Sequence, residues 1–129
     1  YAGKVDHRDD PLFAQARCKL AEIVRGRVWF MMAFCNVIVV RVPGKSGAKS
    51  TLLLIDAGAA SAADHIVEIL SEHFFEKGEF VSHCVYTHGH VDHVGAIPFI
   101  EAAQKSAGHT TPIELWAHER TAARFRRYA

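Results

Sequence analysis

Side chains that commonly bind metals are concentrated in one short segment of the chain, Thr87–His93. The segment reads Thr-His-Gly-His-Val-Asp-His, so that His88, His90, Asp92 and His93 lie within six residues. Imidazole and carboxylate groups are suitable ligands for Zn²⁺, and also for Fe or Mn. A lone histidine is usually solvated or satisfied in the core, but four ligand-type side chains this close together indicate a metal centre.

The expected backbone of this segment explains how the side chains could converge. In an extended chain His88 and His90 point to the same side and could share one metal, whereas a turn at Asp92 and His93 would bring those two to a second position. A second metal about 3.5–4 Å from the first would let the pair hold a water and a substrate oxygen, and would lower the pKa of the water. The small Gly89 would let the backbone pass close to the metal.

The pattern His-x-His-x-Asp-His, preceded by a strand that ends in Asp-x-Gly, resembles the metallo-β-lactamase superfamily. The resemblance runs from about Arg27 to Ala129. Its segments are Asn36–Val40, which resembles the early strand, Leu52–Gly58, which resembles the Asp-Thr-Gly segment with Ala57 for Thr, and Thr87–Ile97, which resembles the metal motif and its following helix.

The resemblance implies a fold and a role for each motif residue. The fold would be an αβ/βα sandwich, in which two sheets face each other and helices cover the outside. His88 and His90 would bind the first metal, and Asp92 and His93 the second. Asp56 would lie near the metal loop and brace the ligands as a second-shell residue. Capping of the helix that follows is an equally open role for Asp56.

Full members of this family supply further ligands from a second half: a third His, a bridging Asp and a last His. The segment Gly108–Thr110 looks like the third-ligand segment, but it stands only sixteen positions after His93, where we expect a helix-to-strand loop. His118, at an expected strand end, is a weak supplementary candidate. We therefore expect only the N-terminal αβ half of the sandwich over residues 27–129, preceded by a lead-in or helix over residues 1–26.

The activity implied by the resemblance is metal-dependent hydrolysis with a dinuclear zinc centre. A metal-bound hydroxide would attack an ester, lactone, thioester, amide, or sulfate or phosphate ester, and Asp92 could orient the attacking water. The alternative is a truncated or degenerate half-domain that binds metal incompletely and acts through a partner chain, with self-association through an exposed sheet face. Flavin-linked diiron chemistry is a third possibility, but Gly89 stands where such members tend to place Glu.

Alternating strands and helices would position these residues, which predicts an α/β (α+β) domain with a sheet covered by helices. β-branched and aromatic residues favour strands before the motif, and apolar residues at helical spacing favour helices on both sides of it. The expected elements are a short helix or irregular lead-in over Leu12–Val24, a hairpin or meander over Val28–Val42 and Thr51–Ile55, a helix over Ala62–Phe75, a strand over Phe80–Tyr86, a helix over Val94–Lys105, a strand over Ile113–Ala117 and a helix over Glu119–Tyr128.

Composition narrows the classes of partner. The 129 residues carry a formal charge of +1, which gives no reason to expect nucleic acid. The partner that the family resemblance implies is a small-molecule substrate. Cys18, Cys35 and Cys84 are widely spaced and odd in number, which argues against a disulfide framework and against a Cys-ligated zinc. The longest apolar stretch, Val28–Val40, is interrupted by Asn36 and too short to span a membrane. We expect a cytoplasmic protein that does not bind membranes.

Overall fold

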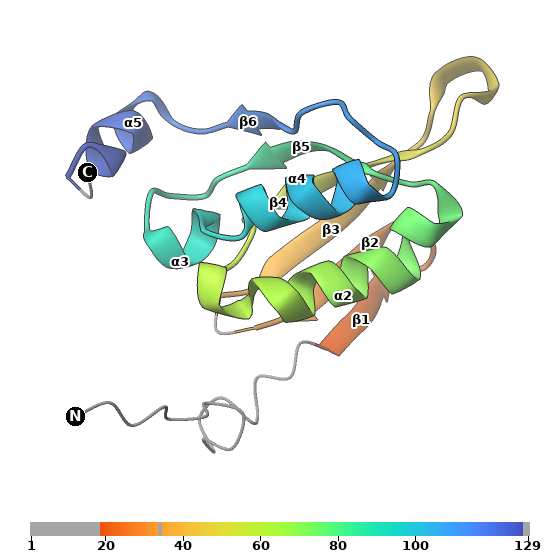
Figure 1. Ribbon diagram of the computed structural model, residues 1–129, viewed down its shortest axis with the longest axis horizontal. Helices are drawn as coiled ribbons and strands as arrows, with labels where there is room; N and C mark the ends of the chain where they lie inside the picture. The colour runs from red at the N-terminus through yellow and green to blue at the C-terminus, as the bar shows by residue number, and fades with distance from the viewer. Residues whose placement is uncertain (1–18, 34, 128–129) are drawn as a thin grey trace.

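The computed structural model describes residues 19–33 and 35–127, which form one mixed β-sheet with helices packed on one of its faces (Figure 1). The strands are β1 (Lys19–Val24), β2 (Val28–Met32), β3 (Val37–Val42), β4 (Thr51–Ile55), β5 (Val81–Val85) and β6 (Glu114–Trp116). The α-helices are α2 (Ala63–His73), α3 (Val91–Val94), α4 (Ile97–Ser106) and α5 (Glu119–Phe125), and the 3₁₀ turns are η2 (Lys45–Gly47), η3 (Ala60–Ala62) and η4 (Phe75–Lys77).

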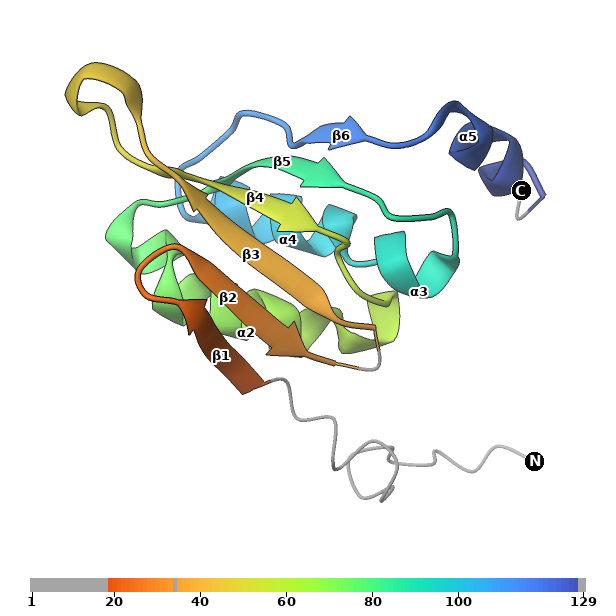
Figure 2. The ribbon, with the colours of Figure 1, turned by 180° about the vertical axis from the view of Figure 1, so that it is seen from behind.

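The strands of the sheet follow one another in sequence order, from β1 to β6. Neighbouring strands are antiparallel from β1 to β4, whereas β4, β5 and β6 are parallel to one another. A parallel pair needs a crossover connection, which α2 supplies between β4 and β5 and α4 between β5 and β6. Because both crossovers advance in the same direction, their common right-handedness puts both helices on one face of the sheet. Figure 2 shows the opposite face, with the strands in front and α2 and α4 behind them.

The hydrophobic core lies between the sheet and these two helices. Alternate residues of the central strands are fully buried, as are the apolar residues of α2 that face them. Each such side chain contributes about 1.5–3 kcal/mol by leaving water. The alternating strand residues on the other face are only partly buried, because no helix covers them. The fully buried core residues include Met31, Val37, Val39, Leu52, Leu54, Ile66, Leu70, Val81, Cys84 and Ile100.

The short helix or irregular lead-in expected over Leu12–Val24 is wrong in its second part. Lys19–Val24 is strand β1, which pairs antiparallel with β2, and Leu12–Cys18 lies outside the described residues. The connection is a tight turn in which Gly26 takes a positive φ of 66° and donates its N–H to the Glu22 carboxylate. Pairing with a neighbouring strand here outweighs a near-helical spacing of apolar residues, which is only a weak local preference.

The other expected elements are present, with shifted boundaries. The run over Val28–Val42 divides into β2 and β3, which form an antiparallel meander with β4. The helix expected over Val94–Lys105 is α4, which begins three residues later than expected and follows the separate short helix α3. Gly95 lies between the two helices and packs closely against the loop after β4, since a Cβ there would lie 2.7 Å from the backbone N of Ala60. Within the described ranges, none of the helices is both long enough and apolar enough to pass through a lipid bilayer. The division of the chain at residue 26 remains a prediction.

Candidate metal centre

The ligand-type residues gather at one end of the sheet, where β4 and β5 finish and β3 begins; we call this the ligand end. Because β4 and β5 are parallel, their carboxyl ends lie side by side, and Ile55 pairs with Val85 there. The antiparallel neighbour β3 brings its amino end to the same place, since Ile38 pairs with Ile55. Residues that follow β4, follow β5 and precede β3 therefore meet, although they are far apart in the sequence.

Backbone hydrogen bonds fasten the loop after β4 to the short helix α3. Ala57 N donates to the carbonyl of His93 at 2.7 Å, and Ala96 N donates to the carbonyl of Gly58 at 3.1 Å. Gly58 has a φ of 83°, and a Cβ there would lie 2.5 Å from the Cδ1 of Ile66. The Asp-x-Gly loop thus fixes the position of the segment that carries the ligands.

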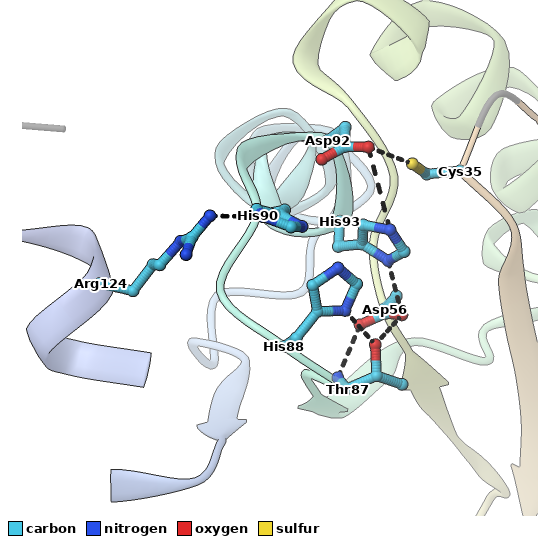
Figure 3. A network of polar contacts seen from close by, with 8 residues as sticks. All are labelled: Cys35, Asp56, Thr87, His88, His90, Asp92, His93 and Arg124. Atoms are coloured by element: carbon cyan, nitrogen blue, oxygen red, sulfur yellow. Dashed lines mark hydrogen bonds and ion pairs between the residues drawn. The ribbon is translucent and has the colours of Figure 1, made fainter. Parts of the chain in front are cut away.

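Asp56 is at the centre of the polar network at the ligand end (Figure 3). Its side chain is buried, and its carboxylate accepts hydrogen bonds from Thr87 N at 2.8 Å and from Thr87 Oγ1 at 2.6 Å. Its Oδ2 also lies 2.8 Å from His93 Nδ1. The N-cap of α2 is Ala62, with no capping side chain, so the helix-capping alternative for Asp56 is wrong. Asp56 instead contacts a candidate ligand and the residue before the motif histidines.

The contact with Asp56 determines which nitrogen of His93 is available to bind a metal. A carboxylate can only accept, so the neutral His93 ring carries its proton on Nδ1 and keeps the lone pair on Nε2. His93 Nε2 lies 3.9 Å from Asp92 Oδ2. A carboxylate behind a histidine ligand is the usual arrangement in metal sites, because it fixes the ring and raises its basicity.

Cys35 is a residue of the ligand end that the sequence did not indicate. Its Sγ donates a hydrogen bond to Asp92 Oδ2 at 2.8 Å, and this bond is the main cause of a lowered Asp92 pKa. Burial, together with the same bond, raises the pKa of Cys35 to about 12. The available signal was topological: Cys35 lies two residues before the start of β3, which begins at the ligand end.

The described residues contain two groups of three whose ligand atoms lie within 4.8 Å of one another. One is Cys35, Asp92 and His93, and the other is Asp56, His88 and His93. The structure therefore brings three of the four expected motif ligands, His88, Asp92 and His93, into these groups. The fourth is outside them.

His90, the fourth motif residue, faces away from these groups toward α5. Its Nε2 lies 2.5 Å from Arg124 Nη2, although its ring is 4.7 Å from the ring of His88. Gly89 is also packed against α5, since a Cβ there would lie 3.1 Å from Thr121 Cγ2. The space that a side chain at Gly89 would need is therefore filled by α5, and the close passage of the backbone by a metal remains a prediction.

The two histidines outside the motif that were considered as ligands have other contacts. His118 is the N-cap of α5, where its Nδ1 accepts a hydrogen bond from Arg120 N at 3.2 Å. His109 lies in the loop between α4 and β6, as expected, and its ring stacks on Phe80 at 4.5 Å. Neither belongs to the two groups found among the described residues.

The residues at the ligand end fit a zinc ion by the chemistry of their donors. They offer imidazole nitrogen, carboxylate oxygen and thiol sulfur, which are the ligands that zinc takes in proteins. His88 and His90 are exposed, so an ion can reach them from solvent. The site combines an accessible side with a braced, partly buried side at Asp56 and Cys35.

Comparisons with known proteins agree with this geometry. The family model described as "Metallo-beta-lactamase superfamily" matches residues 32–124. No curated protein is similar enough in sequence to count as a match.

Several solved structures share the fold. They include a Cronobacter sakazakii metallo-beta-lactamase described by its HARLDQ motif (20% identity, TM-score 0.60), a beta-lactamase domain protein from Burkholderia ambifaria (20%, 0.61), and BJP-1, a subclass B3 metallo-beta-lactamase of Bradyrhizobium japonicum (21%, 0.54). They cover 90%, 88% and 82% of this chain, which in turn spans only 40%, 38% and 35% of theirs. The described sheet and helices therefore correspond to one αβ half of that fold.

Proposed function

Because the chain belongs to the metallo-beta-lactamase superfamily, we propose that it provides the metal-binding half of a hydrolase with a dinuclear zinc centre. The superfamily consists typically of metal-dependent hydrolases. The observation that supports this proposal most directly is the network at the ligand end, in which Asp56 braces His93 beside Asp92 and His88. A core aspartate that holds one histidine of a ligand cluster has the form of a metal site with its supporting shell.

The proposed roles follow from what each side chain contacts. His88, His90, Asp92 and His93 would hold the metal, and Asp56 would keep the His93 ring oriented with Nε2 toward it. Zinc bound there would lower the pKa of a coordinated water and polarise a substrate oxygen. Asp92 is partly exposed, so its carboxylate could also accept a hydrogen bond from the attacking water and orient it. The substrate class we propose is an ester, lactone, thioester, amide, or sulfate or phosphate ester.

A second candidate function is that of a half-domain that binds metal incompletely and acts only with the other αβ half, supplied by a partner chain. The uncovered face of the sheet favours it. A shallow apolar depression on this face is lined by Val42, Leu53, His83, Val85 and Trp116, and the Trp116 side chain is 56% exposed. Exposed apolar area of this kind normally marks a surface that another layer covers.

The test of the proposed function is metal content together with hydrolysis. The purified chain would be reconstituted with zinc, its metal per chain measured by elemental analysis, and a panel of small esters and lactones assayed. We expect bound zinc that is reduced in a His88→Ala variant and retained in His65→Ala, which alters an exposed histidine of α2.

The outcomes separate the two candidates. Hydrolysis that is lost in Asp92→Asn supports the hydrolase. Bound zinc without turnover, together with dimers in light scattering, favours the half-domain that needs a partner. A folded chain that takes up no zinc would contradict the metal centre itself.

A further inference from the structure

A thiol from a distant part of the chain lies against one of the proposed metal ligands. Cys35 is 57 positions from Asp92 in sequence, yet its Sγ is 2.8 Å from Asp92 Oδ2, and its side chain is buried at the ligand end. We infer that Cys35 is itself a metal ligand, which completes with Asp92 and His93 a three-residue site built within this chain. This inference rests on the proposed metal centre and names one further residue of it.

The hydrogen bonds of His93 favour this group over the other one that contains the same histidine. In the alternative group Asp56 would be a ligand, but its carboxylate already accepts from Thr87 N, Thr87 Oγ1 and His93 Nδ1. A metal on Asp56 would compete with all three of these bonds. The group with Cys35 uses Nε2, the nitrogen that Asp56 leaves with its lone pair, and keeps the whole Asp56 network intact.

The distances in this group are close to those that one ion requires. Zinc binds sulfur at about 2.3 Å and nitrogen or oxygen at about 2.0–2.2 Å, so its ligand atoms lie on the order of 3–4 Å apart. Asp92 Oδ2 lies 2.8 Å from Cys35 Sγ and 3.9 Å from His93 Nε2, and the three ligand atoms are all within 4.8 Å of one another. Small side-chain movements would centre them on an ion. Figure 3 shows Asp92 joined by dashed lines both to the Cys35 thiol and to the His93 imidazole.

Proton and charge balance are also satisfied. When a divalent ion binds, the S–H bond of Cys35 breaks, a bond between sulfur and the metal forms, and the proton goes to solvent. The proton that now joins Sγ to Asp92 Oδ2 is thereby replaced by the metal. Thiolate and carboxylate together neutralise the two positive charges, and the neutral His93 adds none. A site with no net charge is the least costly kind to place at a partly buried position.

Cobalt(II) is a suitable probe for this inference, because a thiolate bound to it gives a charge-transfer absorption in the near ultraviolet that nitrogen and oxygen ligands do not give. The reduced 129-residue chain would be titrated with cobalt as wild type, Cys35→Ser and Cys84→Ala. Cys84 is a matched control, since it is the other described cysteine, is buried in the core and belongs to neither of the two ligand groups. Zinc affinity would be measured by competition with a chromophoric chelator, and folding of each variant by circular dichroism.

We expect the absorption in wild type and in Cys84→Ala, and its loss in Cys35→Ser. Zinc affinity should fall by more than the roughly 10–100-fold that accompanies loss of a residue that merely supports a ligand. If cobalt binds the wild type without this absorption, Cys35 is not a ligand, but the proposed metal centre is not contradicted. This result does not depend on whether the Cys35→Ser variant folds. An absorption that persists in Cys35→Ser would also overturn the inference. Failure of the folded wild type to bind cobalt or zinc would contradict the metal centre as a whole.

Discussion

Replacement of Asp56 by Asn tests whether one carboxylate holds the ligand end together. Asp56 has a φ of 58°, in the left-handed region, and Asn tolerates this conformation as well as Asp does. The substitution therefore changes the charge and one acceptor atom and introduces little backbone strain. The amide oxygen can still accept from Thr87 N, and the Thr87 hydroxyl can turn to accept from the new NH₂ group.

The contact with His93 is the one that the amide cannot keep in its present form. The new NH₂ group would face His93 Nδ1 at the position of Oδ2, so the ring would have to move its proton to Nε2. Loss of a hydrogen bond to a charged, buried acceptor costs about 1.5–3 kcal/mol, and we expect this decrease in the free energy of unfolding of the metal-free chain. Zinc affinity should fall by about 10–100-fold, because Nε2 would have to lose a proton before it could bind.

Urea unfolding and chelator competition measure the two effects separately. Asp64→Asn is the matched control: it makes the same chemical change at an exposed position in the first turn of α2, where it costs at most about 0.3–1 kcal/mol through the helix dipole and leaves zinc affinity unchanged. If Asp56→Asn left both the unfolding free energy and the zinc affinity at wild-type values, the bracing role of Asp56 would be refuted.

Two further predictions concern pH and the helix α5. The free energy of unfolding of the reduced, metal-free chain should fall as pH rises from 9 toward 12, because burial raises the pKa of both Cys35 and Cys84 to about 12 from 9.0, so the unfolded chain binds fewer protons in that range. The unfolding free energy should fall by up to about 1.4 kcal/mol per pH unit for each thiol, and by less in Cys84→Ala. Urea titrations would measure it, and an equal unfolding free energy at about pH 8 and about pH 10 would contradict the prediction. Arg124→Ala should strengthen zinc binding by roughly fivefold, on the order of 1 kcal/mol, because it removes a positive charge that lies against His90 Nε2. Chelator competition would measure this, with the exposed Arg126→Ala as control, and weaker binding in Arg124→Ala would count against a ligand role for His90.

The sequence predicted which segments are strands and helices better than it predicted which strands pair with one another. Alternating apolar residues in β3 and β4 and the helical stripe of α2 are local patterns, and both types of element were predicted correctly. The strand Lys19–Val24 was not, because its conformation depends on pairing with β2 and its own residues are almost all exposed. Local preference is strong where burial selects one face, and weak at an edge strand where the neighbour decides.

At the candidate site, the sequence indicated the residues that lie together in the motif and missed those that come from elsewhere. The contact between Asp56 and the motif was expected from the family resemblance, whereas the Cys35 contact with Asp92 was not. An odd number of widely spaced cysteines gave no reason to consider a thiol. Strand order supplies that reason, because it brings the start of β3 to the ends of β4 and β5.

Metal binding and hydrolysis should be separable in this chain, because the ligand end is supported unevenly. Asp56 and Cys35 are buried and held by contacts within the described residues, so the side of the centre that includes His93 and Asp92 is already organised. His88 and His90 are exposed on the other side, where nothing in the described residues excludes bulk water. Catalysis by oriented charges depends on a site from which water is largely excluded, since water weakens every electrostatic interaction there. We therefore expect metal affinity to be a property of these 129 residues, and rapid turnover to require the layer that covers the open side of the fold.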